Sequence, residues 1–257
     1  MRIAALASGS WGNCFYIEDR KAQTAVLIDA GISTRQICAR LQVLGLEPHK
    51  IKGIFITHEH IDHVKGADVF ARKFKVPIFA TKKTAAKRLL CSETSLIKQI
   101  KNNDLVSIGN LQIEAFSKSH SAADPVSFTV HGKIRVSVIT DAGHVCKNIV
   151  SHISLADFLF IESNHDPDML KRGPYPEHLK YWIAGDRGHL SNKQTGLAVL
   201  EHGSGKLKNI VLSHLSESNN TPELALQTFN SLIGRKTCYS PKIYVSTKHS
   251  PTKLFRF

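Results

Sequence analysis

A cluster of four metal-binding side chains directly follows a short apolar segment, and this cluster constrains the fold more than any other feature of the chain. Residues 53–57 have the pattern of a short buried strand, and the residues that follow include His58, His60, Asp62 and His63. His58 and His60 are two positions apart, so an extended backbone places both on one side. Neutral imidazole and carboxylate are ligands for zinc, manganese or iron. Because so tight a turn cannot easily bring all four donors to one ion, the spacing favours two adjacent metals.

Four other His and Asp residues have a similar setting, because each comes at or just beyond the end of a predicted strand. They are Asp29 after residues 26–28, His120 after residues 113–118, Asp141 after residues 136–140 and His214 after residues 210–213. Taken singly, each could equally belong to a turn or a helix cap. Their shared position predicts that they lie at sheet edges and makes them candidates for the remaining positions of a two-metal site.

Predicted strands and helices alternate along the whole chain. Strands are expected at residues 3–7, 14–18, 24–29, 53–57, 76–80, 105–108, 111–116, 126–130, 135–140, 158–163, 209–212 and 242–246. Helices are expected at residues 34–44, 64–74, from 81 to 90, 191–202 and 221–233. Two sheets covered by helices on their outer faces accommodate this order, which predicts an α/β fold. We expect a single domain over residues 1–257.

The composition is that of an ordinary globular protein with a strong excess of positive charge. Apolar residues make up 42% and charged residues 21% of the chain, which excludes a disordered chain, a collagen-like rod and a coiled coil. No apolar run approaches the ~18 residues that cross a bilayer, and the short apolar start predicts a core strand, not a secretory signal. Lys and Arg number 34 against 21 Asp and Glu, and the net charge of +13 favours nucleic acid as partner over a membrane surface. A positive charge that serves only solubility is the alternative.

Five scattered cysteines indicate reduced thiols. Cys14, Cys38, Cys91, Cys146 and Cys238 are odd in number and include no CxxC pair. This pattern argues against a disulfide framework or a zinc ribbon. It predicts a cytoplasmic protein.

The His58-x-His60-x-Asp62-His63 motif, together with the strand-end residues, resembles the metallo-β-lactamase superfamily over most of the chain. The resemblance implies a four-layer αββα sandwich with a two-metal site at the edge of the sheets. It also implies a hydrolase that uses a hydroxide shared by two divalent metals, zinc or manganese. In that arrangement one metal is held by His58, His60 and His120, the second is held by Asp62, His63 and His214, Asp141 bridges the two, and Asp29 orients the motif by hydrogen bonding.

Four finer motifs resemble the branch of the superfamily known as YycJ/WalJ or VicX. They are Ser8-Gly9-Ser10-x-Gly12-Asn13, Glu162-Ser163-Asn164-His165-Asp166, Asp186-Arg187-Gly188-His189-Leu190-Ser191-Asn192, and His214-Leu215-Ser216-x-x-Asn219-Asn220-Thr221-Pro222-Glu223-Leu224. Members of this branch are cytoplasmic bacterial proteins described as metal-dependent 5′-to-3′ exonucleases that act on duplex DNA. The resemblance therefore favours DNA over RNA as the partner and implies no membrane attachment. The candidates for contacts with phosphate or substrate are Ser8, Asn13, Ser191 and Asn219.

The chain departs from the branch pattern at two positions, neither of which is a proposed ligand. Trp11 stands where a second small residue is expected, and Ser121 follows His120 where Asp is expected. Trp11 could narrow the mouth of the site or stack on a base. The departure therefore concerns substrate preference more than activity.

Gly188-His189-x-Ser191 resembles an element of the nucleolytic β-CASP branch, in which the His contacts the scissile phosphate. His189 is therefore a candidate catalytic residue beside Asp62, the expected acceptor of the nucleophile's proton; a capping or core role for His189 is the alternative. Only 72 residues separate Asp141 from His214. A β-CASP domain of over ~100 residues does not fit there, so we expect a compact nuclease without that insertion.

Three alternatives to a DNA exonuclease stay open. A ribonuclease of the same superfamily would share the metal site. A small-molecule ester or lactone hydrolase is disfavoured by the positive charge, and a non-catalytic DNA-binding module is disfavoured because every expected ligand is present. Residues 235–257 carry six basic residues and no acidic one, which is compatible with a basic C-terminal extension or with a solvated end.

Overall fold

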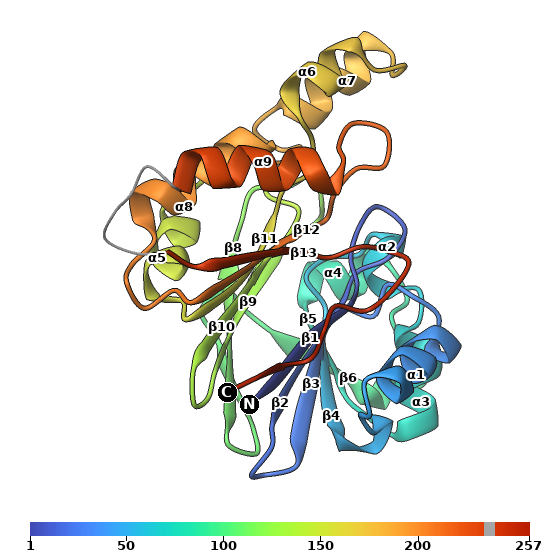
Figure 1. Cartoon of the computed structure of the whole chain (residues 1–257). Helices are drawn as coiled ribbons and strands as arrows, with labels where there is room; N and C mark the ends of the chain where they lie inside the picture. The colour runs from blue at the N-terminus through green and yellow to red at the C-terminus, as the bar shows by residue number, and fades with distance from the viewer. Residues whose placement is uncertain (234–239) are drawn as a thin grey trace. The chain divides into compact units, whose positions relative to one another are not determined.

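The computed structural model describes residues 1–233 and 240–257 (Figure 1). Within them the strands are β1 (Arg2–Ala7), β2 (Cys14–Asp19), β3 (Thr24–Ile28), β4 (Ile51–Phe55), β5 (Ile78–Thr81), β6 (Ile97–Ile100), β7 (Leu105–Ile108), β8 (Leu111–Ser117), β9 (Val126–His131), β10 (Arg135–Ile139), β11 (Phe158–Glu162), β12 (Asn209–Ser213), β13 (Lys242–Val245) and β14 (Phe255–Arg256). The helices are α1 (Thr34–Val43), α2 (Ile61–Val64), α3 (Ala67–Phe74), α4 (Lys82–Lys87), α5 (Lys147–Leu155), α6 (Pro167–Arg172), α7 (Glu177–Ala184), α8 (Asn192–His202) and α9 (Pro222–Ile233), with short 3₁₀ turns at Pro48–Lys50 and Thr94–Leu96. The described strands form two mixed sheets, in the orders β14-β1-β2-β3-β4-β5-β6 and β13-β12-β11-β10-β9-β8-β7.

The predicted strands are confirmed to within three residues at their ends, whereas several helices differ. The helix expected at residues 64–74 is two helices, because the chain turns at Gly66 between α2 and α3. The Gly66 N–H donates to Ala30 O over 2.8 Å, and a Cβ at this position would lie 2.1 Å from Ile32 O, so only glycine permits this close approach. The helix expected to reach residue 90 ends at Lys87. The sequence patterns also missed β6, β14 and the helices α5 and α7.

The first compact unit contains most of the N-terminal half of the chain and its C-terminal end. It comprises Met1–Ser117, Ala122–Ile134 and Thr247–Phe257. In its larger sheet β14, β1, β2 and β3 are antiparallel neighbours, and β3, β4, β5 and β6 are parallel neighbours. Strands β7, β8 and β9 form a further antiparallel set.

One buried apolar cluster joins the strands and helices of this unit. Leu27 of β3 and Ile54 of β4 belong to it with Ile37 of α1 and Phe70 of α3. Helices α1 and α3 thus cover one face of the sheet (Figure 1). Because β3 and β4 are parallel, their carboxyl ends meet at the same edge. This edge carries the residues that follow both strands.

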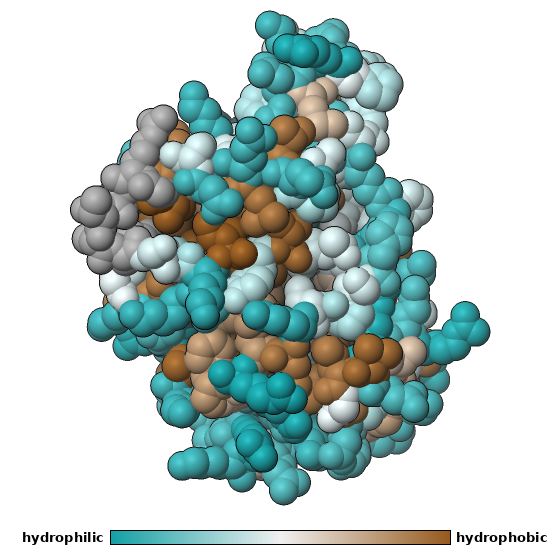
Figure 2. Space-filling view, viewed as in Figure 1, coloured by the Kyte–Doolittle hydropathy of each residue, from teal (hydrophilic) through white to brown (hydrophobic). Residues whose placement is uncertain are grey.

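The second compact unit contains a parallel sheet. It comprises Lys118–Ser121 and Arg135–Ser246, apart from residues 234–239. Strands β10, β11, β12 and β13 are parallel and adjacent, and α5 and α9 pack on them, with α8 against both helices. Helices α6 and α7 stand away from these strands in Figure 1, and hydrophilic side chains cover the outer end of that segment in Figure 2. The carboxyl ends of β10, β11 and β12 share one edge, as the ends of β3 and β4 do.

No additional domain interrupts the second unit between Asp141 and His214. Every residue between them is described, and they form α5, β11, α6, α7, α8 and β12 with their connections. The prediction of a fold without a β-CASP insertion is therefore confirmed. The prediction of a single domain over residues 1–257 stays a prediction.

The described part of the C-terminal segment belongs to the sheets. Residues 234–239, which include the start of the basic segment at residues 235–257, lie outside the described residues. Strand β13 pairs in parallel with β12, and β14 pairs antiparallel with β1. Residues 240–257 therefore supply an edge strand to each sheet and are not a free arm.

Candidate metal centre

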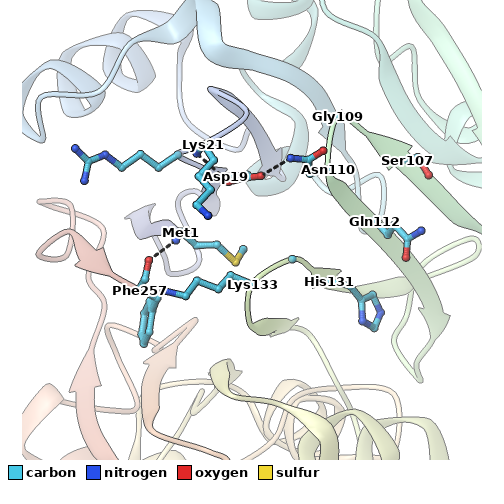
Figure 3. A pocket seen from close by; sticks show the side chains of 12 residues that line it. Met1, Asp19, Lys21, Ser107, Gly109, Asn110, Gln112, His131, Lys133 and Phe257 are labelled. Carbon is cyan, nitrogen blue, oxygen red and sulfur yellow. Dashed lines mark hydrogen bonds between the residues drawn. The ribbon is translucent and has the colours of Figure 1, made fainter.

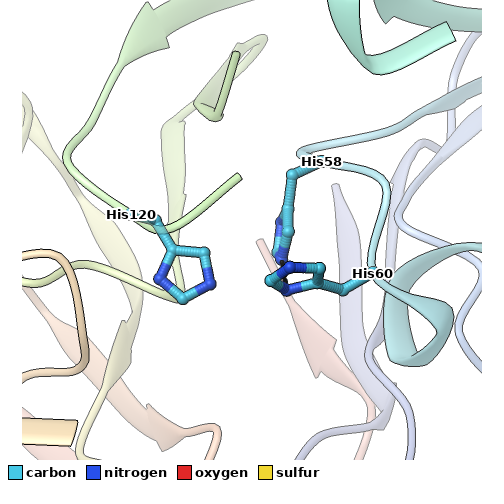
Figure 4. A group of neighbouring side chains, drawn as sticks. All are labelled: His58, His60 and His120. Carbon is cyan, nitrogen blue, oxygen red and sulfur yellow. Dashed lines mark hydrogen bonds between the residues drawn. The ribbon is translucent and has the colours of Figure 1, made fainter. Parts of the chain in front are cut away.

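The turn after β4 gathers four donors of the first unit. Nε2 of His58 lies 3.0 Å from Nδ1 of His60, and Nε2 of His63 lies 3.2 Å from Oδ2 of Asp62. The His58 and His60 rings meet edge to face, with their centroids 4.5 Å apart, as Figure 4 shows. His58 and His63 are fully buried. The structure thus brings together the four residues of the sequence motif.

Asp29, which follows β3, holds this turn in place by hydrogen bonds. Its side chain is fully buried. Oδ1 accepts the backbone N–H of Thr57 over 2.8 Å, and Oδ2 accepts Nδ1–H of His63 over 2.7 Å. The Thr57 hydroxyl donates to Oδ2 over 2.9 Å. With Nδ1 bound to a carboxylate, the ring presents Nε2 as a ligand atom, which is how carboxylates orient metal-binding histidines.

A second set of donors lies at the shared edge of β10 and β12 in the second unit. Nε2 of His214 lies 3.5 Å from Oδ1 of Asp141, and Nε2 of His120 lies 3.9 Å from the same oxygen. Nδ1 of His120 donates to Gly188 O over 3.1 Å. Burial lowers the pKa of His120 to about 4, so its imidazole is neutral at pH 7, as a metal ligand must be.

Glu162, the last residue of β11, organises this second set. Oε1 accepts Nδ1–H of His189 over 2.8 Å and Nδ1–H of His214 over 2.9 Å. Three backbone N–H groups also donate to the carboxylate, from Asp141 (3.2 Å), Ala142 (2.9 Å) and Leu190 (3.0 Å). Burial alone would raise the pKa of this fully buried carboxyl, but the two histidines hold it below its usual range, so the group is ionised.

Glu162 is a site residue that the sequence analysis left without a role. It satisfies the rule that selected Asp29, Asp141 and His214, because it follows the apolar run of residues 158–161. The signal was therefore present in the sequence.

Trp182 of α7 completes the surroundings of His189 in the second unit. The two ring centroids are 5.7 Å apart with an interplanar angle of 79°, and the Trp182 centroid is 6.4 Å from that of His120. Nε1–H of Trp182 donates to Ser121 Oγ over 3.2 Å. Ser121, where the branch pattern has Asp, thus accepts a hydrogen bond from this indole. No sequence pattern singled out Trp182.

Three of the strand-end residues have left-handed backbone conformations. The φ angles are 58° at Asp29, 54° at Asp141 and 56° at His214. Residues other than glycine rarely adopt this region, and such strain is concentrated at functional sites. These backbone conformations position the three side chains, and they lower the stability of the folded protein.

We expect a glycine at position 214 to give a more stable protein than an alanine there. Both substitutions remove the imidazole, but only glycine adopts a φ of 56° without a Cβ clash, which favours His214→Gly over His214→Ala by about 1 kcal/mol. Urea unfolding measures the difference. At Ser213, within β12, the order should reverse, because glycine is unfavourable inside a strand. The same order at both positions would contradict the strain argument.

The donors of each unit fit divalent metal ions. Neutral imidazole nitrogens and ionised carboxylates are the ligand set of zinc and manganese sites. In the second unit, ligand atoms of Asp141, Glu162, His189 and His214 all lie within 4.8 Å of one another. In the first unit Asp29 accepts one backbone N–H and fixes His63. In the second unit Glu162 accepts three backbone N–H groups and fixes His189 and His214.

The four predicted substrate contacts are all buried and have structural partners. Ser8 Oγ donates to Asn13 Oδ1 over 3.0 Å, and Asn13 Nδ2 lies 3.4 Å from Asp62 Oδ2, so this pair adjoins the first set of donors. Ser191 caps α8 in a capping box with Gln194. Asn219 Nδ2 donates to Ser216 Oγ over 3.4 Å. Their contacts with substrate stay a prediction.

The first unit also contains a pocket, drawn in Figure 3, that none of its metal donors lines. Its volume is about 770 Å³, and Met1, Asp19, Asn110 and Lys133 are among the residues that line it. It adjoins the start of β1, whereas the loop that contacts Asp62 follows the end of β1. Six residues of extended strand place these ends roughly 20 Å apart, so this pocket is not the candidate metal centre.

Comparison with known protein families agrees with a metal centre formed by these residues. A family model described as the β-lactamase superfamily domain matches residues 24–214, which include every predicted ligand. The chain belongs to the β-lactamase superfamily.

Two curated relatives define the branch. Exodeoxyribonuclease YycJ of Bacillus anthracis is 35% identical over 240 residues, which are 92% of this chain and 90% of that protein. Exodeoxyribonuclease WalJ of Streptococcus pneumoniae serotype 2 (strain D39) is 36% identical over 233 residues, 88% of this chain and 86% of that protein. The resemblance to the YycJ/WalJ branch is thus confirmed.

Solved structures show the fold. The metallo-β-lactamase fold protein YhfI of Bacillus subtilis matches with a TM-score of 0.73 at 12% identity, over 98% of both chains. Zn²⁺-bound PqqB of Methylobacterium extorquens matches with a TM-score of 0.72 at 16% identity, over 98% of this chain and 99% of that chain. The predicted α/β sandwich of the metallo-β-lactamase type is therefore confirmed. Among the described residues, no helix is long and apolar enough to span a membrane.

Proposed function

We propose that this chain is a metal-dependent phosphodiesterase that degrades DNA from the 5′ end, with two divalent metals, zinc or manganese. Its relatives named exodeoxyribonuclease support a metal-dependent nuclease. The observation that carries the proposal is the pair of donor sets, each fixed by a buried carboxylate, Asp29 in one unit and Glu162 in the other. A chain that kept the fold without metal-dependent activity would not need both donor sets and their buried carboxylates.

The assignment of ligands is part of this proposal and rests on the superfamily resemblance. One metal would be held by His58, His60 and His120, the other would be held by Asp62, His63 and His214, and Asp141 would be a ligand available to both. When bound, such metals lower the pKa of water from ~15.7 towards ~7 and offset negative charge on phosphate oxygens. Asp62 is also the proposed acceptor of the proton that the attacking water loses.

His189 is the proposed contact for the scissile phosphate. Because Nδ1–H donates to the ionised Glu162, the ring is held in one orientation with Nε2 directed away from the carboxylate. A protonated Nε2 donates to a phosphate oxygen or to the leaving oxygen, where it stabilises developing charge.

The charge of the chain supports a polyanionic substrate. A net charge of +13 attracts the phosphate backbone and makes binding dependent on salt. The four described cysteines, Cys14, Cys38, Cys91 and Cys146, are free, which supports the proposed cytoplasmic location.

Cleavage of a duplex labelled at either end tests the proposal. The substrate is a 5′-phosphorylated DNA duplex, incubated with Mn²⁺ or Zn²⁺ and, in parallel, with a chelator. We expect mononucleotides to be released from the 5′ end with metal and none with the chelator. An uncleaved DNA duplex, with metal binding confirmed separately, would reject the proposal and favour RNA or a small ester as substrate.

A further inference from the structure

An exposed tryptophan and a lysine of the C-terminal segment meet on the first unit, beside the metal-binding motif. Trp11 lies in the loop between β1 and β2 and is 69% exposed. Lys248 Nζ lies over its ring, 5.3 Å from the centroid. An exposed indole beside a cation offers a flat face on which a planar group can stack.

The loop that carries Trp11 is held rigidly. The Asn13 side chain accepts the Gly9 N–H over 3.1 Å and donates to Gly9 O over 3.2 Å, and the Gly12 N–H donates to Gly9 O over 3.0 Å. A Cβ at Gly12 would lie 2.5 Å from the Ile32 side chain, so the loop packs closely on its inner side. This packing holds the loop in place, and the indole of Trp11 lies on its exposed side.

The segment that carries Lys248 is anchored as well. Arg40 donates through Nη2 to Lys248 O over 2.6 Å and through Nη1 to Leu6 O over 2.7 Å. The Ser8 N–H donates to Thr247 O over 3.2 Å. Arg40 thus ties the segment to the end of β1, and the lysine and the indole are supported by the same framework.

This framework adjoins Asp62 of the metal-binding motif. The backbone N–H of Asn13, two residues after Trp11, donates to Asp62 O over 2.7 Å, and Asn13 Nδ2 lies 3.4 Å from Asp62 Oδ2. The loop that carries Trp11 is therefore hydrogen-bonded to the motif. The supporting segment is basic, because residues 247–257 include Lys248, Lys253 and Arg256 and no acidic residue.

We propose that Trp11 and Lys248 form a platform for the unpaired nucleobase at the end of a DNA strand, which rests on the proposed nuclease function. The base stacks on the exposed indole, and the ammonium group of Lys248 contacts a neighbouring phosphate. Aromatic side chains bind bases of any sequence in this way, and lysines follow the backbone. The departure of Trp11 from the small residue of the branch pattern thus gives this chain a preference for ends that can open.

Tryptophan fluorescence tests the platform directly. The chain has two tryptophans, so in the Trp182→Phe variant all indole emission comes from Trp11. Asp62→Ala is combined with it to prevent cleavage, and a fluorescein-labelled single-stranded oligonucleotide reports binding by anisotropy. We expect an unlabelled oligonucleotide to quench Trp11 emission with the midpoint that anisotropy gives. Binding seen by anisotropy without any change in emission would overturn the platform.

Matched substitutions separate the two members of the platform. We expect Trp11→Ala to weaken single-strand binding about 10-fold or more and Trp11→Tyr to restore most of it, since stacking needs a ring. Val43→Ala, at a residue that is 75% exposed at the end of α1, should change nothing. Lys248→Gln should reduce the log–log salt slope by about one. Equal affinity of wild type and Trp11→Ala would reject the platform.

The wild-type protein distinguishes failure of the platform from failure of the function. If wild type cleaves DNA while Trp11→Ala binds and cleaves equally well, only the platform is wrong. If wild type neither binds nor cleaves DNA, the proposed function is wrong and the platform falls with it.

Discussion

Replacement of Glu162 by glutamine is expected to destabilise the protein and to weaken metal binding at the same time. The carboxylate is fully buried and accepts five hydrogen bonds, from His189, His214 and three backbone N–H groups. A glutamine presents an NH₂ group to some of these donors and leaves them unpaired. Breaking such a buried charged network costs about 3 kcal/mol or more. Urea unfolding measures this loss.

Metal affinity supplies the second readout for Glu162→Gln. Loss of a carboxylate that orients metal-binding histidines typically lowers affinity 10–100-fold, which a competition titration with a chromogenic chelator measures. Glu114→Gln is the matched control, because Glu114 also contacts a histidine, His131, over 2.8 Å, but both side chains are partly exposed. It should cost less than about 1 kcal/mol. Equal effects of the two substitutions would show that Glu162 has no special role.

Replacement of Asp62 by alanine is expected to abolish DNA cleavage and to leave the fold intact. Asp62 lies in the turn that opens α2, its side chain is 17% exposed, and its carboxylate contacts His63 Nε2 and Asn13 Nδ2. The apolar cluster of the first unit does not include it. As a proposed ligand and proton acceptor, it affects the reaction far more than the core. We expect activity below one hundredth of wild type, the scale of lost general-base catalysis of about 10²-fold or more.

Circular dichroism and urea unfolding show whether Asp62→Ala is folded. Glu201→Ala, on the exposed face of α8, removes a carboxylate elsewhere and should retain full activity. Undiminished, metal-dependent cleavage by Asp62→Ala would reject its catalytic role. Loss of activity together with unfolding would instead make Asp62 a structural residue.

The position of His and Asp residues at the ends of predicted strands identified much of the candidate centre from sequence. The residues that this criterion missed were missed for physical reasons. Asp29, Asp141 and His214 could be selected because a buried strand delivers the next side chain to a sheet edge. Glu162 obeys the same rule, but its importance depends on hydrogen bonds from His189 and Leu190, which lie 27 and 28 residues further along the chain. Sequence spacing does not place such partners.

Several helices likewise could be predicted from periodicity, whereas their contacts with distant residues could not. Periodicity found α8, and Ser191, which stays a candidate substrate contact, caps that helix with Gln194. The break between α2 and α3 depends on the close approach of Gly66 to Ile32, a contact with the preceding loop. Trp182 was missed because only the folded chain brings α7 to His189.

The pairing of β14 with β1 has a consequence for the order in which the protein folds during synthesis. Strand β1 leaves the ribosome before its outer neighbour β14, which is made only after all the described strands of the second unit. Until then β1 exposes an unpaired backbone edge, which is a template for association with other chains. In a nascent chain of this topology the edge of β1 is covered by β14 only late in synthesis. A chain that ended before residue 255 would leave that backbone edge permanently unpaired.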